Sequence, residues 1–249
     1  MVSVTRSGRL PVGSLRSFIL ALVLVAAAAP AGAQSWSSTD VQWLHGSGFE
    51  LGPGTRDILT FEHVSTWDFG SNFFFFDVSE FTGDDTALYG EWYSRLSWAR
   101  LGVKEESTGV LRDVSFAASL NAGDGFRAYL AGATLHFSVP GVSFLDLDVM
   151  YYDDRSDADA TYIVTPAWEL PFRIGSLPCR FRGFIDSIGP EGERKAQLLA
   201  QPQLLVDLGR FLGDEERLFA GVEYQYWHNK YGIDGVDESL PQLMLLWQF

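Results

Sequence analysis

Aromatic and polar residues alternate clearly over residues 61–81, FEHVSTWDFGSNFFFFDVSEF, and this pattern predicts two strands joined by a tight turn. Successive side chains of a strand point to opposite faces, so Phe74 falls on one face and Phe73, Phe75 and Asp77 fall on the other. Both faces are aromatic, and one also carries a charge. A soluble sheet would turn the charged face to water. A membrane barrel would turn the apolar face to lipid and the Asp77 face to its lumen.

The same period-two pattern recurs along the chain in runs of about ten residues that end in Gly, Asp, Asn, Ser or Pro. These runs predict twelve strands, at residues 41–51, 57–66, 72–81, 87–101, 110–121, 126–139, 142–153, 160–170, 178–187, 195–208, 217–228 and 239–249. The fourth run is the clearest, with Trp92 on one face and Glu91, Tyr93 and Arg95 on the other. Pro166 and Pro202 lie in the eighth and tenth runs, which are the least regular because proline donates no ladder hydrogen bond.

The N-terminus has the pattern of a secretory signal. Three arginines precede an apolar run at residues 18–29, and small residues follow it up to Ala33. We therefore expect a signal peptide over residues 1–33, cleaved after Ala33, and a single domain over residues 34–249. The run is shorter than the roughly 20 residues of a transmembrane helix, although a retained membrane anchor is the alternative.

Composition narrows the possible partners. The chain has 18 basic and 32 acidic residues, and losing the three signal arginines leaves 15 basic residues, a net charge of about −17. Such a charge argues against a nucleic-acid partner, and we read the acidic clusters at strand junctions as solvated loops rather than a calcium site. The four histidines lack metal-binding spacing and Cys179 is the single cysteine, so we expect no metal, cofactor or intramolecular disulfide.

The last predicted strand ends the chain on an aromatic residue. Leu243, Leu245, Trp247 and Phe249 share one face, and a terminal Phe is typical of the segment that bacterial outer-membrane barrels present to the assembly machinery. An even strand number also places both ends on the periplasmic side. We therefore predict an all-β chain that forms a monomeric transmembrane antiparallel barrel with up-and-down meander order in the outer membrane. A secreted sandwich with a buried edge strand is the alternative.

Several segments resemble a known family. The hairpin FEHVSTWDFGSNFFFFDVS, the fourth strand's EWYSRLS, the stretch EYQYWHNKYG at 223–232 and the closing PQLMLLWQF are similar to the Tsx-like nucleoside-specific channel-forming proteins of the outer membrane. The resemblance implies a twelve-stranded monomer that passes nucleosides through a narrow lumen lined by aromatic and ionisable side chains. This chain is shorter, with reduced outer loops, so the preferred solute stays open.

The predicted lumen residues combine rings with ionisable groups. Aromatic faces stack on a flat base at about 1 to 3 kcal/mol each, and ionisable neighbours bond the ribose and the base edges. The candidates for substrate binding are Glu62, Phe73, Phe75, Asp77, Glu91, Tyr93, Arg95, Glu223 and Gln225. The alternative is that these charges form a structural network that stiffens the barrel. Glu91 and Arg95 lie four residues apart on one face, so we expect each to pair with a neighbouring strand.

Two other functions stay open besides a channel. A barrel enzyme that modifies lipid would need a His and Ser pair near the rim, and His63 with Ser65 or His136 with Ser138 are the candidates. Neither pair has an acid two residues on, and no Gly-x-Ser-x-Gly occurs, so we expect no enzyme. A closed barrel that acts as a surface or structural element is the third possibility.

Overall fold

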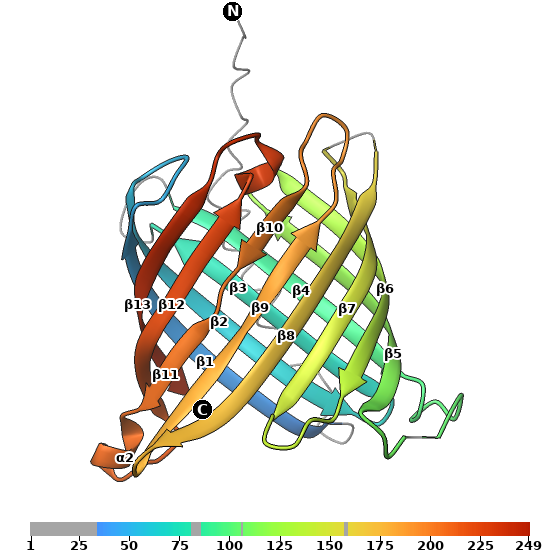
Figure 1. The fold of residues 1–249 in the computed structure, drawn as a ribbon, viewed down its shortest axis with the longest axis vertical. Helices are drawn as coiled ribbons and strands as arrows, with labels where there is room; N and C mark the ends of the chain where they lie inside the picture. Colours follow the sequence, from blue (N-terminus) through green and yellow to red (C-terminus); the bar gives the residue numbers. More distant parts are fainter. Residues whose placement is uncertain (1–33, 81–85, 106, 157–158) are drawn as a thin grey trace, which may run out of the picture.

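The computed structural model describes residues 34–80, 86–105, 107–156 and 159–249. Within these residues the chain forms one antiparallel sheet rolled into a tilted cylinder (Figure 1). The cylinder closes because β1 (Gln34–Ser47) pairs with both β2 (Thr55–Trp67) and β13 (Glu238–Gln248). The signal peptide predicted at residues 1–33 lies outside the described residues.

The strands follow one another around the barrel in chain order. Between β2 and β13 these are β3 (Gly70–Ser79), β4 (Ala87–Ser97), β5 (Leu111–Gly123), β6 (Phe126–Phe137), β7 (Phe144–Asp154), β8 (Thr161–Ile174), β9 (Leu177–Ile188), β10 (Gln197–Ala200), β11 (Gln203–Asp207) and β12 (Leu218–His228). Both β10 and β11 pair with β9 and β12, so they are two parts of one interrupted strand. The fold is therefore the predicted closed twelve-stranded antiparallel barrel with meander order.

Several predicted strand bounds need correction: the fourth strand ends at Ser97 rather than at 101, the eighth continues to Ile174 rather than 170, and the first and tenth differ most. The first was placed at residues 41–51, but β1 starts at Gln34 and stops at Ser47. Its polar start, QSWSSTD, has no apolar alternation, yet it pairs with β2 as far as Trp67. The strand ends at Ser47 because the next residue, Gly48, has a positive φ of 101°, which is incompatible with extended backbone.

The tenth predicted strand, at 195–208, is broken at Gln201 and Pro202. Opposite the break is Gly183 of β9, where a Cβ atom would lie 2.6 Å from the Gln201 carbonyl oxygen. The proline therefore sits at an irregularity that only a glycine neighbour permits. Pro166 is accommodated differently, since β8 runs through it and only the ladder to β9 is interrupted, between the pairs Val164–Ser187 and Ala167–Phe184.

The outer face of the barrel is apolar. Large exposed side chains point outward from most strands, among them Leu59, Val149, Leu204, Val222, Leu243 and Leu245. Several exposed aromatic residues lie near the strand ends: Tyr129, Tyr151, Tyr162 and Tyr226 at one end, and Trp36, Phe144 and Trp247 at the other, while Trp92 and Phe116 lie in mid-strand. An apolar outer band with aromatic residues toward both ends is the surface that a transmembrane barrel presents to lipid. No helix in the described part of the chain is long and apolar enough to cross a membrane.

The two ends of the barrel differ. The short helix α2 (Gly209–Leu212) and the C-terminus lie at one end, and the 3₁₀ turn η1 (Lys230–Gly232) lies at the opposite end (Figure 1). We refer to these as the α2 end and the η1 end. Long connections occur at both, 98–110 and 208–217 at the α2 end and 229–237 at the η1 end. Loop length therefore does not tell the two ends apart.

Candidate functional site

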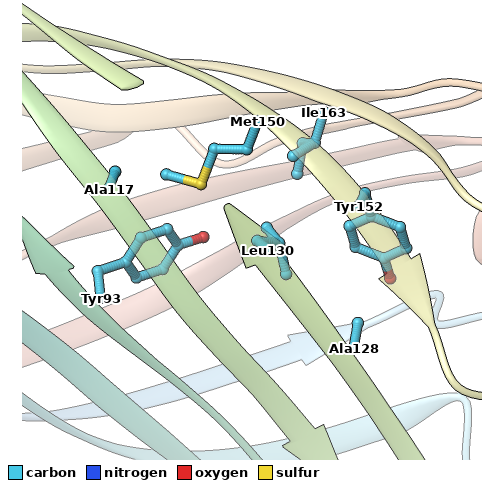
Figure 2. Packing of buried hydrophobic residues seen from close by; sticks show 7 residues of the cluster. All are labelled: Tyr93, Ala117, Ala128, Leu130, Met150, Tyr152 and Ile163. Carbon is cyan, nitrogen blue, oxygen red and sulfur yellow. The ribbon is translucent and has the colours of Figure 1, made fainter. Parts of the chain in front are cut away.

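Two apolar clusters narrow the lumen from opposite walls. The first comes from β4 to β8 and consists of Tyr93, Ala117, Ala128, Leu130, Met150, Tyr152 and Ile163, whose side chains point toward one another inside the barrel (Figure 2). The second comes from β1 and β11 to β13 and consists of Leu44, Leu205, Phe219, Met244 and Leu246. Polar side chains cross the space that remains between these two walls.

A row of polar side chains crosses four neighbouring strands. Arg182 of β9, Gln203 of β11, Glu223 of β12 and Gln242 of β13 are direct cross-strand neighbours. Arg182 Nε donates to Gln203 Oε1 at 2.6 Å, and Gln203 Nε2 donates to Glu223 Oε2 at 2.7 Å. Gln242 Nε2 donates to Glu223 Oε1 at 2.8 Å. The four side chains therefore form one continuous hydrogen-bonded chain.

Arg182 extends this row of hydrogen bonds across the lumen. Its Nη1 lies 3.2 Å from Glu62 Oε1 on β2 and 3.5 Å from Asp40 Oδ2 on β1. Gln42 Nε2 donates to Asp40 Oδ1 at 2.8 Å and to Glu62 Oε2 at 3.3 Å. Because β2 and β9 are not neighbours in the sheet, the contact spans the interior. We call Gln42, Glu62, Arg182, Gln203, Glu223 and Gln242 the polar belt.

A second row places a ring between two carboxyl groups. Glu62 of β2, Phe75 of β3 and Glu91 of β4 are direct cross-strand neighbours that face the lumen. Glu91 is held by three donors: the hydroxyls of Tyr89 at 2.5 Å and Tyr93 at 2.9 Å, and the amide of Asn121 at 2.9 Å. A flat solute beside Phe75 would therefore meet acceptor oxygens on both sides.

Other rings and one further acid surround Phe75. Its ring centroid lies 6.0 Å from that of Phe73 and 6.1 Å from that of Tyr89, and Phe73 lies 6.1 Å from Tyr93. Asp77, two residues along β3, accepts a 2.5 Å hydrogen bond from Thr60 Oγ1. The aromatic rings that could stack on a solute and the carboxyl groups that could accept its hydrogen bonds therefore lie in the same part of the barrel wall.

Arg95 reaches farther than we expected. Its Nη2 lies 2.7 Å from Asp148 Oδ2 on β7, and its Nε donates to Thr134 on β6 at 3.0 Å. The expectation of a partner on a neighbouring strand holds for Glu91, through Asn121 of β5, but Arg95 skips its neighbour. The curvature of the barrel brings these more distant strands within reach of a long side chain.

Gln225 connects the belt to the η1 end. It accepts from Gln201 Nε2 at 2.9 Å and donates to Glu238, which also binds the buried Lys230 ammonium at 2.6 Å. Burial lowers the pKa of Lys230, and the contact with Glu238 acts in the opposite direction. Loop 229–237 is therefore fixed to the rim by an ion pair withdrawn from water.

All nine predicted residues face the lumen, and whether they bind a solute stays a prediction. Arg182 ties Glu62 to Glu223, two candidates on facing walls. Sequence reasoning did not select the residues that complete this link, which are Asp40, Gln42, Arg182, Gln203 and Gln242. Alternation puts Arg182 and Gln203 on the more polar side of the ninth and tenth predicted strands, but nothing in the pattern marks them as partners.

The histidines have partners other than those considered for an enzyme. His63 points outward and bonds Thr39 at 2.7 Å, beside the Phe74 ring. His136 points inward, with Nε2 at 2.8 Å from Ser115 Oγ and Nδ1 at 2.8 Å from Asp146 Oδ1. Within the described residues, the hydrogen-bond partners of the two rings are therefore not Ser65 and Ser138. Cys179 is buried on β9, as expected of a small apolar residue.

Comparison with known proteins supports the fold. No protein-family model matches the chain, and no curated protein matches it. Among solved structures it is similar to KdgM porin, with a TM-score of 0.52 and 10% identity over 85% of this chain and 99% of that chain. A structure of KdgM porin in complex with disordered oligogalacturonate gives a TM-score of 0.50 at 10% identity over the same shares. The Acinetobacter baumannii outer membrane protein Omp33 gives 0.39 at 12% identity, covering 88% of this chain and 99% of that one. The chain therefore has the fold of a porin barrel.

Proposed function

We propose that this protein is an outer-membrane channel for the passive uptake of small solutes, with nucleosides and similar flat, neutral molecules as the preferred class. The outward apolar band with aromatic residues toward both ends supports insertion in a membrane. The likeness to porins supports the same placement at the level of the fold. The resemblance to the Tsx-like family supports the nucleoside class.

The row Glu62–Phe75–Glu91 carries the proposal. A ring between two acceptor groups offers a base a stacking face and offers a ribose hydrogen-bond partners. Selectivity without trapping needs several such weak sites in series, and Phe73, Tyr89 and Tyr93 continue the aromatic wall. The belt then forms the narrow part of the path.

Single-channel recording in planar bilayers tests the proposal. The refolded mature protein should conduct, and uridine at millimolar concentration should block the current. Phe75→Ala should weaken the block at least about threefold while the conductance persists, because one stacking face is lost. Phe74→Ala is the matched control, since the neighbouring ring points outward against His63 and should leave the block unchanged. Equal block in both variants would remove Phe75 from the site.

A closed structural barrel is the competing function, and the filled lumen favours it. Both apolar clusters and the belt consist largely of buried side chains. A barrel of this kind would give no current in the same recording. That result would replace the channel with a structural role.

A hydrolytic enzyme is favoured by one specific arrangement, Ser115–His136–Asp146, which has the order of contacts of a catalytic triad. Ser115 is only 2% exposed, which denies a lipid acyl chain access to its hydroxyl. Labelling with a fluorophosphonate probe separates the two cases. Modification of the wild type that is absent in Ser115→Ala would establish the enzyme, and no modification would leave the three residues as a structural network.

A further inference from the structure

The central lumen contains carboxyl groups that have no direct ion pair among the described residues. Four of them, Asp77, Glu91, Asp186 and Glu223, come from four strands, and none has an ion pair among the described residues. The two guanidinium groups nearby have their ion pairs with other acids, although Arg182 Nη2 has no hydrogen-bond partner in the described part of the chain. Arg95 pairs with Asp148 at 2.7 Å, and Arg182 pairs with Glu62 at 3.2 Å and Asp40 at 3.5 Å.

These four acids act on one another across the interior. Glu91 lies within electrostatic range of Asp77 and of Asp186, and Asp77 lies within electrostatic range of Glu223. They therefore surround one space rather than four separate niches. Rings of acidic side chains at a constriction are a common basis for cation preference in pores.

Glu223 accepts hydrogen bonds from neutral groups only, within the described part of the chain. Its two oxygens accept from Gln203 at 2.7 Å, Gln242 at 2.8 Å and Gln201 at 3.1 Å. Three amides fix the carboxyl group in place, and the Arg182 guanidinium acts on it only through space, without a direct ion pair. A salt bridge in the same place would have cancelled its charge.

A second observation points to a missing donor at the same place. Gln242 is 0% exposed, and while its amide nitrogen bonds Glu223, its Oε1 has no partner among the described residues. A buried acceptor without a donor is costly, and donors usually satisfy such groups. An acceptor oxygen beside a carboxyl group is suited to a cationic hydrogen-bond donor, such as an ammonium group.

We propose that the lumen sorts solutes by charge, admitting cations and neutral molecules that donate hydrogen bonds and rejecting anions. This inference rests on the proposed channel function and adds the charge class of its solutes. An oligogalacturonate, which is a chain of acidic sugars and is bound in one KdgM porin structure, belongs to the class that this lumen should repel. Neutral nucleosides should pass, and phosphorylated nucleosides should not.

Reversal potentials in a KCl gradient test the proposal. We expect the wild type to prefer K⁺ over Cl⁻ by about tenfold or more. Glu223→Gln and Asp186→Asn, each close to isosteric, should each lower the ratio severalfold, and the triple variant with Asp77→Asn should approach equal permeability. The matched control is Asp153→Asn, at a rim position that points away from the lumen, which should leave the ratio unchanged.

Solute swelling with uridine and uridine 5′-monophosphate adds a second readout, because the two share a base and a ribose and differ in charge. Vesicles that contain the wild-type protein should admit uridine at least about tenfold faster than uridine 5′-monophosphate, and the triple variant should reduce that difference. If the triple variant lacks the migration of a folded barrel on a gel run without heating, the single variant Asp77→Asn replaces it, because its side chain can still accept the hydrogen bond from Thr60. Conductance with Cl⁻ preference, or a ratio that the substitutions leave unchanged, would overturn charge sorting and leave the channel intact. No conductance in any variant would overturn both.

Discussion

Replacing Arg182 with methionine tests whether the cross-lumen contact holds the barrel together. Arg182→Met keeps an unbranched stem in the wall and removes the guanidinium that lies 3.2 Å from Glu62 and 3.5 Å from Asp40. Gln42 then remains as the amide between two carboxyl groups, since it donates to both. The substitution leaves two acids facing each other without a cation.

The size of the effect follows from burial. Arg182 and Asp40 side chains are 13% and 8% exposed, and Glu62 is 24% exposed. Removing one member of a buried ion pair costs about 3–5 kcal/mol, whereas exposed pairs contribute about 0–1 kcal/mol. Because Glu62 retains some contact with water, we expect a loss of about 3 kcal/mol in the free energy of unfolding.

Urea unfolding of the protein in lipid vesicles, followed by tryptophan fluorescence, measures this loss. A double-mutant cycle with Glu62→Gln should show a coupling of about 1–2 kcal/mol, since Glu62→Gln alone relieves the repulsion that Arg182→Met creates. Arg155→Met is the control, because Arg155 pairs with Asp153 at 2.9 Å on an exposed rim and should cost under about 1 kcal/mol. A loss below about 1 kcal/mol for Arg182→Met, with no coupling, would refute the structural role of the belt.

Two further predictions address the membrane face and the η1 end. Leu243→Arg, at an exposed outward position near the middle of β13, should lower the free energy of unfolding in vesicles by about 2–4 kcal/mol. Tyr226→Arg, near a strand end, should lower it by at most about 1 kcal/mol. Equal losses in the same urea titration would contradict a lipid-facing band. At the η1 end, the backbone N–H of Asn229 and then the His228 side chain lower the pKa of Asp237 below its ordinary 3.8. A lowered folded-state pKa means that the contribution to loop stability is present above pH 3.8 and is lost as the pH falls through the folded value. The protection factors of the amides in loop 229–237, taken relative to the intrinsic exchange rate at each pH, should therefore fall below about pH 3.8, and this fall should vanish in Asp237→Asn.

The alternation of side chains predicted the strands well wherever one face was apolar. Period-two spacing alone placed Glu91 and Arg95 inside and Trp92 outside, because a barrel in lipid enforces that pattern on both faces. The pattern failed where that constraint is weak. The polar start of β1 has no apolar face to detect, and Pro202 breaks a strand whose alternation continues on either side of the break.

The partners across the lumen lay beyond sequence reasoning for a geometric reason. Cross-strand neighbours follow from register, but contacts such as Arg182 with Glu62 join strands that are not paired, and they depend on the tilt and stagger of the closed barrel. The same holds for Arg95 with Asp148. The sequence therefore predicts which residues face inward, but not which of them bond to one another across the lumen.

The two kinds of acid in the lumen imply that stability and selectivity are separable. Glu62 and Asp40 are paired with Arg182, so their charges serve the contact between facing walls. Glu223 accepts from three amides, which position it without a direct ion pair. If a single network performed both tasks, neutralising any acid would change unfolding and ion preference together. We expect instead that Arg182→Met changes mainly the free energy of unfolding and that Glu223→Gln changes mainly the ratio of cation to anion permeability, since a glutamine there can still accept two of the amide donors.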